Sequence, residues 1–185
     1  MKGRVRRCAV ICALAIVLGG CGGSAPATAE KSASVVRTDE NSIVYFKTDK
    51  GLNAFFEAYN EFAEHPFAVE QIRQGNVRTE ALIQTDNLYV ELVNSANGLD
   101  ILLDDCSEES EELYSVYRDF LKVMDDSLSD KQIEQSWSDI KEIGTGYLYN
   151  GRYSLNRLKM DYSNVEFQGA YQVKVHIFGP QYQPQ

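Results

Sequence analysis

The chain is poor in the residues that most often build reactive sites. Its 185 residues include two histidines, four cysteines and one tryptophan. Zinc sites usually take three or four nitrogen or sulfur ligands at a recognisable spacing, whereas His65 and His176 stand far apart. The chain contains neither the Gly-x-Ser-x-Gly motif of serine hydrolases nor a glycine-rich phosphate loop. We therefore expect no enzyme activity and no cofactor.

Positive charge is scarce as well. There are 18 Lys and Arg residues against 27 Asp and Glu, which gives a net charge of −9 and an isoelectric point near 4.7. Nucleic-acid binding needs a basic face to neutralise phosphates. This charge balance argues against nucleic acid as a partner.

The N-terminus carries an apolar run that is too short to span a bilayer comfortably. Four basic residues, Lys2, Arg4, Arg6 and Arg7, precede the run from Cys8 to Leu18, and Gly19 and Gly20 follow it. A basic segment, a short apolar segment and small residues are typical of a secretory signal rather than of a transmembrane helix. We interpret residues 1–20 as a signal peptide.

The end of this signal has a more specific pattern. Leu18-Gly19-Gly20-Cys21 places two small residues and a cysteine after an aliphatic residue, and so resembles the lipobox of bacterial lipoproteins. The resemblance implies that the Cys21 thiol receives a diacylglyceryl group and that the signal is cut before this cysteine. The two or three acyl chains of this family give stable anchoring, which one chain does not. It also implies a cell-envelope protein whose body faces the extracytoplasmic side.

The mature chain would differ in composition from the precursor. Loss of residues 1–20, whose four charges are all positive, leaves 165 residues with a net charge of −13. Cys8 and Cys12 leave with the signal and Cys21 carries lipid, so Cys106 alone remains. The body must then be stabilised by its core without an internal disulfide.

Composition divides the mature chain into a tether and a body. Small and polar residues dominate the sequence that follows Cys21, and we expect residues 21–38 to form the lipidated cysteine and a flexible tether. A single globular domain is expected over residues 39–180, and residues 181–185 are expected to fray.

The patterns within the body alternate between strand and helix. We expect a strand over 42–47, a helix with an aromatic stripe ending before Pro66, and a three-strand antiparallel meander over 77–84, 88–93 and 99–104. Two helices follow, joined by a short link at 125–128. An Asn-Gly hairpin over 147–153 and an alternating strand over 171–177 complete the pattern. The fold class is predicted to be α+β, an antiparallel sheet with about three packed helices.

The acid-rich middle of the chain raises the question of a metal site. Residues 100–142 contain 14 acidic and four basic residues. Asp104, Asp105 and Glu108 are the first candidates for calcium, but calcium loops need acidic ligands at fixed alternating spacing with a glycine at the turn. Carboxylates at a helix start also complement the helix dipole. We therefore predict no metal site.

Tyrosines gather in the C-terminal third, next to hydrogen-bonding residues. Tyr147, Tyr149, Arg152 and Tyr153 combine flat aromatic faces with polar groups, an arrangement suited to sugar or protein recognition. The same tyrosines could instead pack as cross-strand pairs against the helices. We take these four residues as the candidate for a binding face.

These observations favour a lipid-anchored binding or scaffolding lipoprotein of the cell envelope with an unknown ligand. The membrane is its first partner, through Cys21, and an envelope protein or a glycan is a possible second. Two alternatives stay open: a small extracytoplasmic hydrolase acting through carboxylates, and an inhibitory or exclusion protein at the surface.

The anchor gives a direct prediction. Cys21→Ala removes the only thiol that the lipobox can modify, so the variant is expected to lose its acyl chains and leave the membrane fraction. Metabolic labelling with a fatty acid and membrane fractionation measure this, with Cys106→Ala as the control that keeps both. Unchanged labelling and processing of Cys21→Ala would refute the lipobox interpretation.

Overall fold

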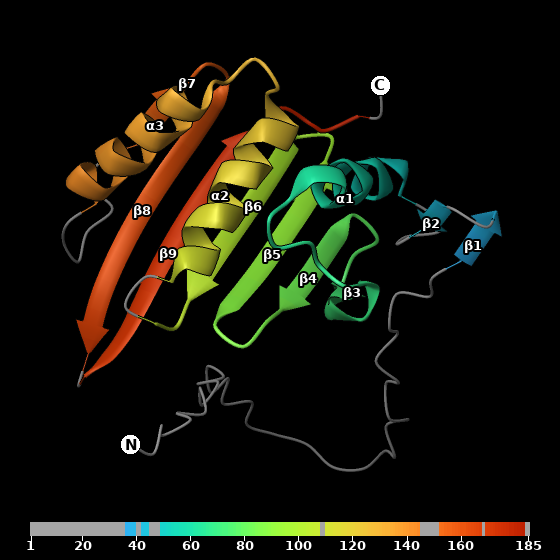
Figure 1. The fold of residues 1–185 in the computed structure, drawn as a ribbon, viewed down its shortest axis with the longest axis horizontal. Helices are drawn as coiled ribbons and strands as arrows, with labels where there is room; N and C mark the ends of the chain where they lie inside the picture. The colour runs from blue at the N-terminus through green and yellow to red at the C-terminus, as the bar shows by residue number, and fades with distance from the viewer. Residues whose placement is uncertain are drawn as a thin grey trace, which may run out of the picture. The chain divides into compact units, whose positions relative to one another are not determined.

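The structure is a computed structural model that describes residues 36–39, 42–44, 49–107, 110–144, 152–167 and 169–183. All of these residues belong to one compact unit, residues 31–185. The unit is an α+β body, as predicted: a seven-stranded antiparallel sheet with three α-helices (Figure 1). None of the helices in the described part of the chain is long and apolar enough to cross a membrane.

The sheet has the strand order β3-β4-β5-β6-β9-β8-β7, and every neighbouring pair is antiparallel. Its strands are β3 (Ile72–Gln74), β4 (Glu80–Gln84), β5 (Leu88–Ser95), β6 (Gly98–Asp105), β7 (Tyr153–Leu155), β8 (Leu158–Phe167) and β9 (Ala170–Gly179). A separate two-stranded hairpin pairs β1 (Val36–Asp39) with β2 (Ser42–Val44). The predicted meander corresponds to β4, β5 and β6. The first strand of the hairpin falls within the stretch expected to be a tether.

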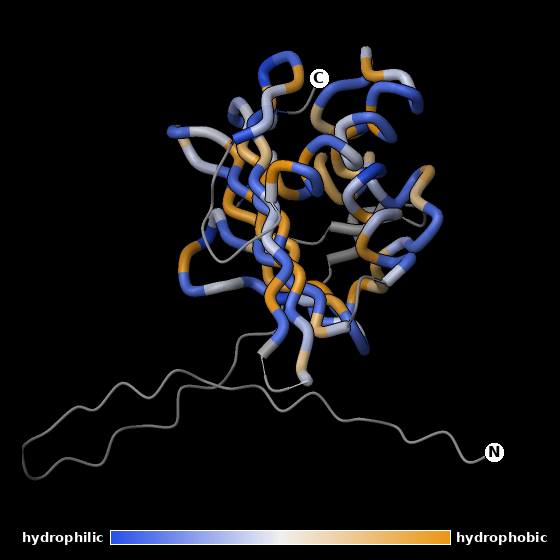
Figure 2. The backbone as a smooth tube through the Cα atoms, turned by 90° about the vertical axis from the view of Figure 1, so that its left-hand side faces the viewer, coloured by the Kyte–Doolittle hydropathy of each residue, from blue (hydrophilic) through white to orange (hydrophobic). Residues whose placement is uncertain are grey.

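Each helix begins where a side chain can accept a hydrogen bond from its first turn. The helices are α1 (Lys50–Phe62), α2 (Glu111–Met124) and α3 (Asp130–Ile143), and a short 3-10 turn, η1, covers Val69–Gln71. Asp49 caps α1, Ser110 caps α2, and Ser129 caps α3 with Gln132 completing a capping box. Figure 2 shows the three helices on one side of the sheet.

The core lies between the helices and the face of the sheet that they cover. Strand burial alternates strictly: every second residue of β5 is buried, and Val173, Val175 and Ile177 are the buried residues of β9. The centre of the helical side is an aromatic cluster around Phe120 of α2. Its ring lies 5.2 Å from that of Phe55 and 4.9 Å from that of Tyr59.

The structure departs from the sequence predictions in two places, the strand β8 and the C-terminal segment. β8, ten residues long, was not predicted, and its hairpin with β7 turns at Asn156, which has a φ of 52°. The predicted hairpin over 147–153 lies mostly outside the described residues. Residues 181–183 were expected to fray, but they are held against the body. The side-chain amide of buried Asn94 donates to the Tyr182 carbonyl and accepts from the Tyr182 N–H, both at 2.9 Å.

The aromatic cluster generates a stability prediction. Phe120→Ala leaves a cavity among three aromatic rings, those of Phe55, Tyr59 and Phe67, and is expected to lower the free energy of unfolding by about 3–5 kcal/mol. Phe62→Ala is the matched control, because Phe62 belongs to the same apolar stripe by spacing yet is 49% exposed. Phe62→Ala is expected to change the free energy of unfolding by no more than about 0.5 kcal/mol. Urea unfolding measures both; equal losses would contradict the cluster's central role.

Candidate functional site

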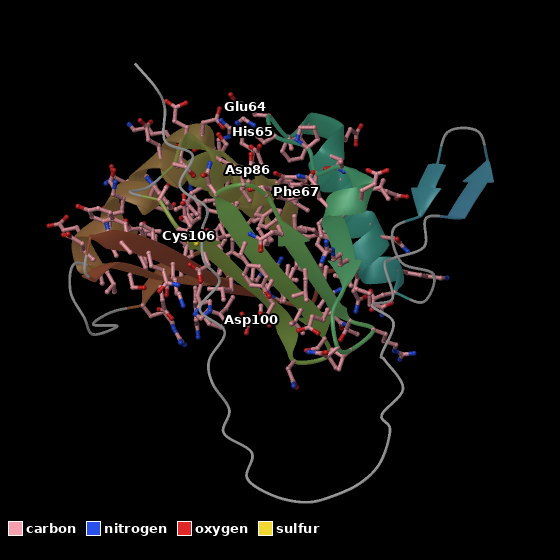
Figure 3. The ribbon with its side chains drawn as sticks, turned by 90° about the horizontal axis from the view of Figure 1, so that it is seen from below. Glu64, His65, Phe67, Asp86, Asp100 and Cys106 are labelled. Atoms are coloured by element: carbon pink, nitrogen blue, oxygen red, sulfur yellow. The ribbon has the colours of Figure 1, made fainter. Side chains whose placement is uncertain are left out.

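A groove opens at the end of the sheet where β4 turns into β5. Its volume is about 670 Å³, and it lies between the loop after α1, the β4–β5 turn and the first turn of α2. Figure 3 shows Glu64, His65, Phe67 and Asp86 gathered at this end, with Asp100 at the other. The described residues that line the groove are Glu64, His65, Pro66, Phe67, Gln71, Gln84, Thr85, Asp86, Asn87 and Glu112.

Side chains of α1 hold one wall of the groove, the loop 63–67. The Asn60 amide donates to the Phe67 carbonyl and accepts from the Phe67 N–H, both at 3.0 Å. The Tyr59 hydroxyl donates to the His65 carbonyl at 2.9 Å. Burial and the nearby carboxylate of Asp119 raise the pKa of Tyr59 far above its ordinary value, so this donor keeps its proton. Side chains of α1 therefore hold the backbone of the loop 63–67 in place.

Side chains of α2 fix the same loop from a second direction. Buried Asp119 accepts the Glu64 N–H at 3.1 Å and the Arg118 Nε–H at 2.7 Å. Arg118 also reaches the Glu64 carboxylate at 3.1 Å. Because Asp119 is only 2% exposed, removing either of its partners would leave a buried charge poorly satisfied.

The opposite wall, the β4–β5 turn, is also closed by hydrogen bonds. The Thr85 N–H donates to the Leu88 carbonyl at 2.9 Å, and the Thr85 hydroxyl accepts the Leu88 N–H at 3.0 Å. The Cys106 N–H donates to the Asn87 carbonyl at 3.1 Å, which ties the turn to the end of β6. Asp86 and Asn87 thus stand exposed on a turn of defined conformation.

The chemistry of the groove is that of a hydrogen-bond acceptor. Its lining has three carboxylates, one imidazole and three side-chain amides, and none of the described lining residues is Lys or Arg. The apolar part is Pro66 and Phe67, whose ring stacks on that of Tyr59 at 5.0 Å. Such a surface suits a ligand that brings cationic or donor groups together with some apolar surface.

The structure separates the predicted tyrosine face. Tyr147 and Tyr149 lie outside the described residues. Tyr153 faces the helices, and burial together with a hydrogen bond to Asp139 of α3 raises its pKa. The Arg152 guanidinium lies 5.0 Å above the Phe178 ring, on the face that the helices leave open, and reaches Asp161 at 3.4 Å. Arg152 and Tyr153 therefore do not share one surface.

The residues first considered as calcium ligands, Asp104, Asp105 and Glu108, are not brought together as one site among the described residues. Asp105 is fully buried and accepts hydrogen bonds from the backbone and hydroxyl groups of Ser107 and Ser110, so its role is to fix the start of α2. Asp104 points to the other side of the sheet, where Lys174 lies 3.4 Å away. Glu108 is outside the described residues. Within the described ranges, no three His, Cys, Asp or Glu residues are grouped to hold a metal ion.

Comparison with known proteins gives no relative. No protein-family model matches the chain, and no curated protein or solved structure matches it either. The groove therefore has to be interpreted from its own residues.

The groove was not predicted from the sequence. The stretch after Pro66 has no clear period, and the sequence marks Asp86-Asn87 only as the link between two predicted strands. The useful signal is Asn60, a polar residue within an apolar helical stripe, whose amide has the geometry to pair with a neighbouring backbone.

The rigidity of the loop is testable. Asn60→Ala removes two hydrogen bonds to Phe67 and is expected to speed hydrogen exchange of the Phe67 amide at least about tenfold, corresponding to roughly 1–3 kcal/mol. The Val90 amide in the central sheet reports global unfolding in the same sample. Exchange at Phe67 that rises no more than at Val90 would show that Asn60 stabilises the whole fold and not the loop.

Proposed function

We propose that the protein is a lipid-anchored binding lipoprotein of the cell envelope, and that the groove binds a cationic segment of an envelope partner. The observation that carries the binding role is the double fixing of the loop 63–67 by α1 and α2. A loop held this way presents Glu64 and His65 in a set geometry, so little ordering entropy is lost when a ligand binds.

The anchor in this proposal comes from the sequence. Cys21 follows two small residues and an apolar signal, and a polar stretch separates it from the described body. Acyl chains on Cys21 would keep the body beside the membrane, and the tether would let it reach partners in the envelope. Binding, not anchoring, is then the work of the folded unit.

The ligand class follows from the lining of the groove. Asp86 stands on one wall, Glu64 on the other, and Glu112 on the first turn of α2. Lysine or arginine side chains in an extended segment would meet these carboxylates, while Phe67 and Pro66 contact the aliphatic parts of the same side chains. Amide groups of Gln71, Gln84 and Asn87 would accept and donate along the segment's backbone.

A labelled hexalysine peptide is the probe for this proposal. The detergent-solubilised, anchored protein is expected to bind the peptide with an affinity that falls as salt is raised, because the contacts are charge-based. Asp86→Asn with Glu112→Gln, which keeps both shapes, is expected to weaken binding about tenfold. Fluorescence anisotropy measures the dissociation constants.

The matched control removes the same charge elsewhere. Asp126→Asn with Glu134→Gln lowers the net negative charge equally, and both residues are exposed at positions outside the groove. We expect less than about a twofold loss for this control. Equal losses for the two double variants would show binding to the overall charge of the body and would reject the groove as the site.

A further inference from the structure

The sheet has a second face that the described helices leave uncovered (Figures 1 and 2). Its side chains alternate with the buried ones and include four half-buried apolar residues, Leu82, Val93, Leu102 and Phe178. Apolar and charged side chains alternate along the cross-strand rows of this face, which gives it both the apolar area and the polar contacts of a protein interface.

Apart from Arg73 on the edge strand β3, the charged residues of this face are segregated by strand. On β4, β5 and β6 they are all acidic, and we define these side chains as the acidic half: Glu80, Glu91, Asp100 and Asp104. We define the basic half as the open-face side chains of β9 and β8 together with Arg152; its charged members are Lys174, Lys159, Arg152 and Asp161. The boundary between the halves runs between β6 and β9, parallel to the strands.

This segregation makes the face complementary to itself. Consider two such faces stacked on each other, related by a two-fold axis that runs along the β6–β9 boundary, parallel to the strands. This operation places β6 over β9, β5 over β8 and β4 over β7 of the other copy. The acidic half of each copy then covers the basic half of its partner. A two-fold axis across the strands would instead put acid over acid, so the charge pattern selects one orientation.

One cross-strand row shows how the contact would work. Register places Val93 opposite Asp100, Asp100 opposite Phe178, and Phe178 opposite Lys159. The Arg152 guanidinium stacks on the Phe178 ring. Under the proposed two-fold axis, Asp100 of one copy meets Phe178 and Arg152 of the other, and the same contact occurs twice.

We propose that the open face of the sheet is a homodimer interface, with a second copy of this chain as its occupant. Strands of eight to ten residues, about 4.8 Å apart with about 3.3 Å per residue, give the face an area on the order of 600 Å². This is close to the roughly 800 Å² per partner of a standard interface. The dimer is independent of the groove, which opens at the end of the sheet.

The negative charge of the body does not oppose this arrangement strongly. Nine of the 14 acidic residues of 100–142 lie in α2, α3 or the link between them, on the helical side of the sheet. With sheets about 10 Å apart and a helical layer about 10 Å behind each, the two acidic layers are about 30 Å apart, well beyond the roughly 8 Å Debye length of physiological salt.

The test uses two tagged copies of the anchored chain, co-expressed, extracted in mild detergent and purified through one tag. Wild-type copies are expected to co-purify. In a pair of D100K copies the new lysines meet Arg152, and in a pair of R152E copies the new glutamates meet Asp100. Each of these like-charge pairs is expected to lower recovery of the second tag about tenfold.

The deciding sample is the mixed pair, D100K with R152E. Both contacts become complementary again, and recovery is expected to return to the wild-type level, which neither misfolding nor micelle sharing would produce. Glu57→Lys, on the exposed side of α1, is the control that keeps wild-type recovery. Wild-type copies that fail to co-purify, or a mixed pair that stays as low as the single variants, would overturn the proposal.

Discussion

The packing around Phe120 is the interaction on which the rest of the described structure depends. This ring of α2 contacts Phe55 and Tyr59 of α1, and its centroid lies 6.2 Å from that of Phe67 in the loop that follows. With Cys106 the one cysteine that the predicted mature body would retain, burial and ring packing have to hold α1 to the rest of the unit. The cluster therefore fixes both the fold and the position of the loop 63–67.

The candidate site adjoins this cluster because residues of the cluster also carry polar groups that bind the loop 63–67. Tyr59 places its ring in the core and its hydroxyl on the His65 carbonyl. Asp119, the residue before Phe120, is buried and accepts the Glu64 N–H. Polar atoms at the margin of an apolar core must find partners, and here the partners are the backbone groups of one loop. Stability of the core and definition of the groove wall thus share the same residues.

The sequence allows prediction of those features that depend on local period. The α+β class and the meander of β4 to β6 follow from alternation and helical spacing. Features that depend on non-local pairing did not follow. The groove needs α1, the β4–β5 turn and α2 at one end of the sheet, and the Asn94–Tyr182 hydrogen bonds join residues 88 positions apart. Asp105 illustrates the same limit: its acidity suggests a metal ligand, whereas it is buried and accepts hydrogen bonds from Ser107 and from Ser110, the cap of α2.

In the proposed anchored protein, the groove and the open face of the sheet would serve two different contacts, one with a ligand and one with a second copy. The groove at the end of the sheet collects carboxylates from three separate segments. The open side carries its acidic half on one side of the β6–β9 boundary and its basic half on the other, a pattern that is complementary to a second copy of the same surface. A tether that confines copies to one membrane raises their effective concentration, and a modest face-to-face affinity then suffices for pairing. Pairing through the open face would leave the end of each sheet, and with it each groove, available to a ligand.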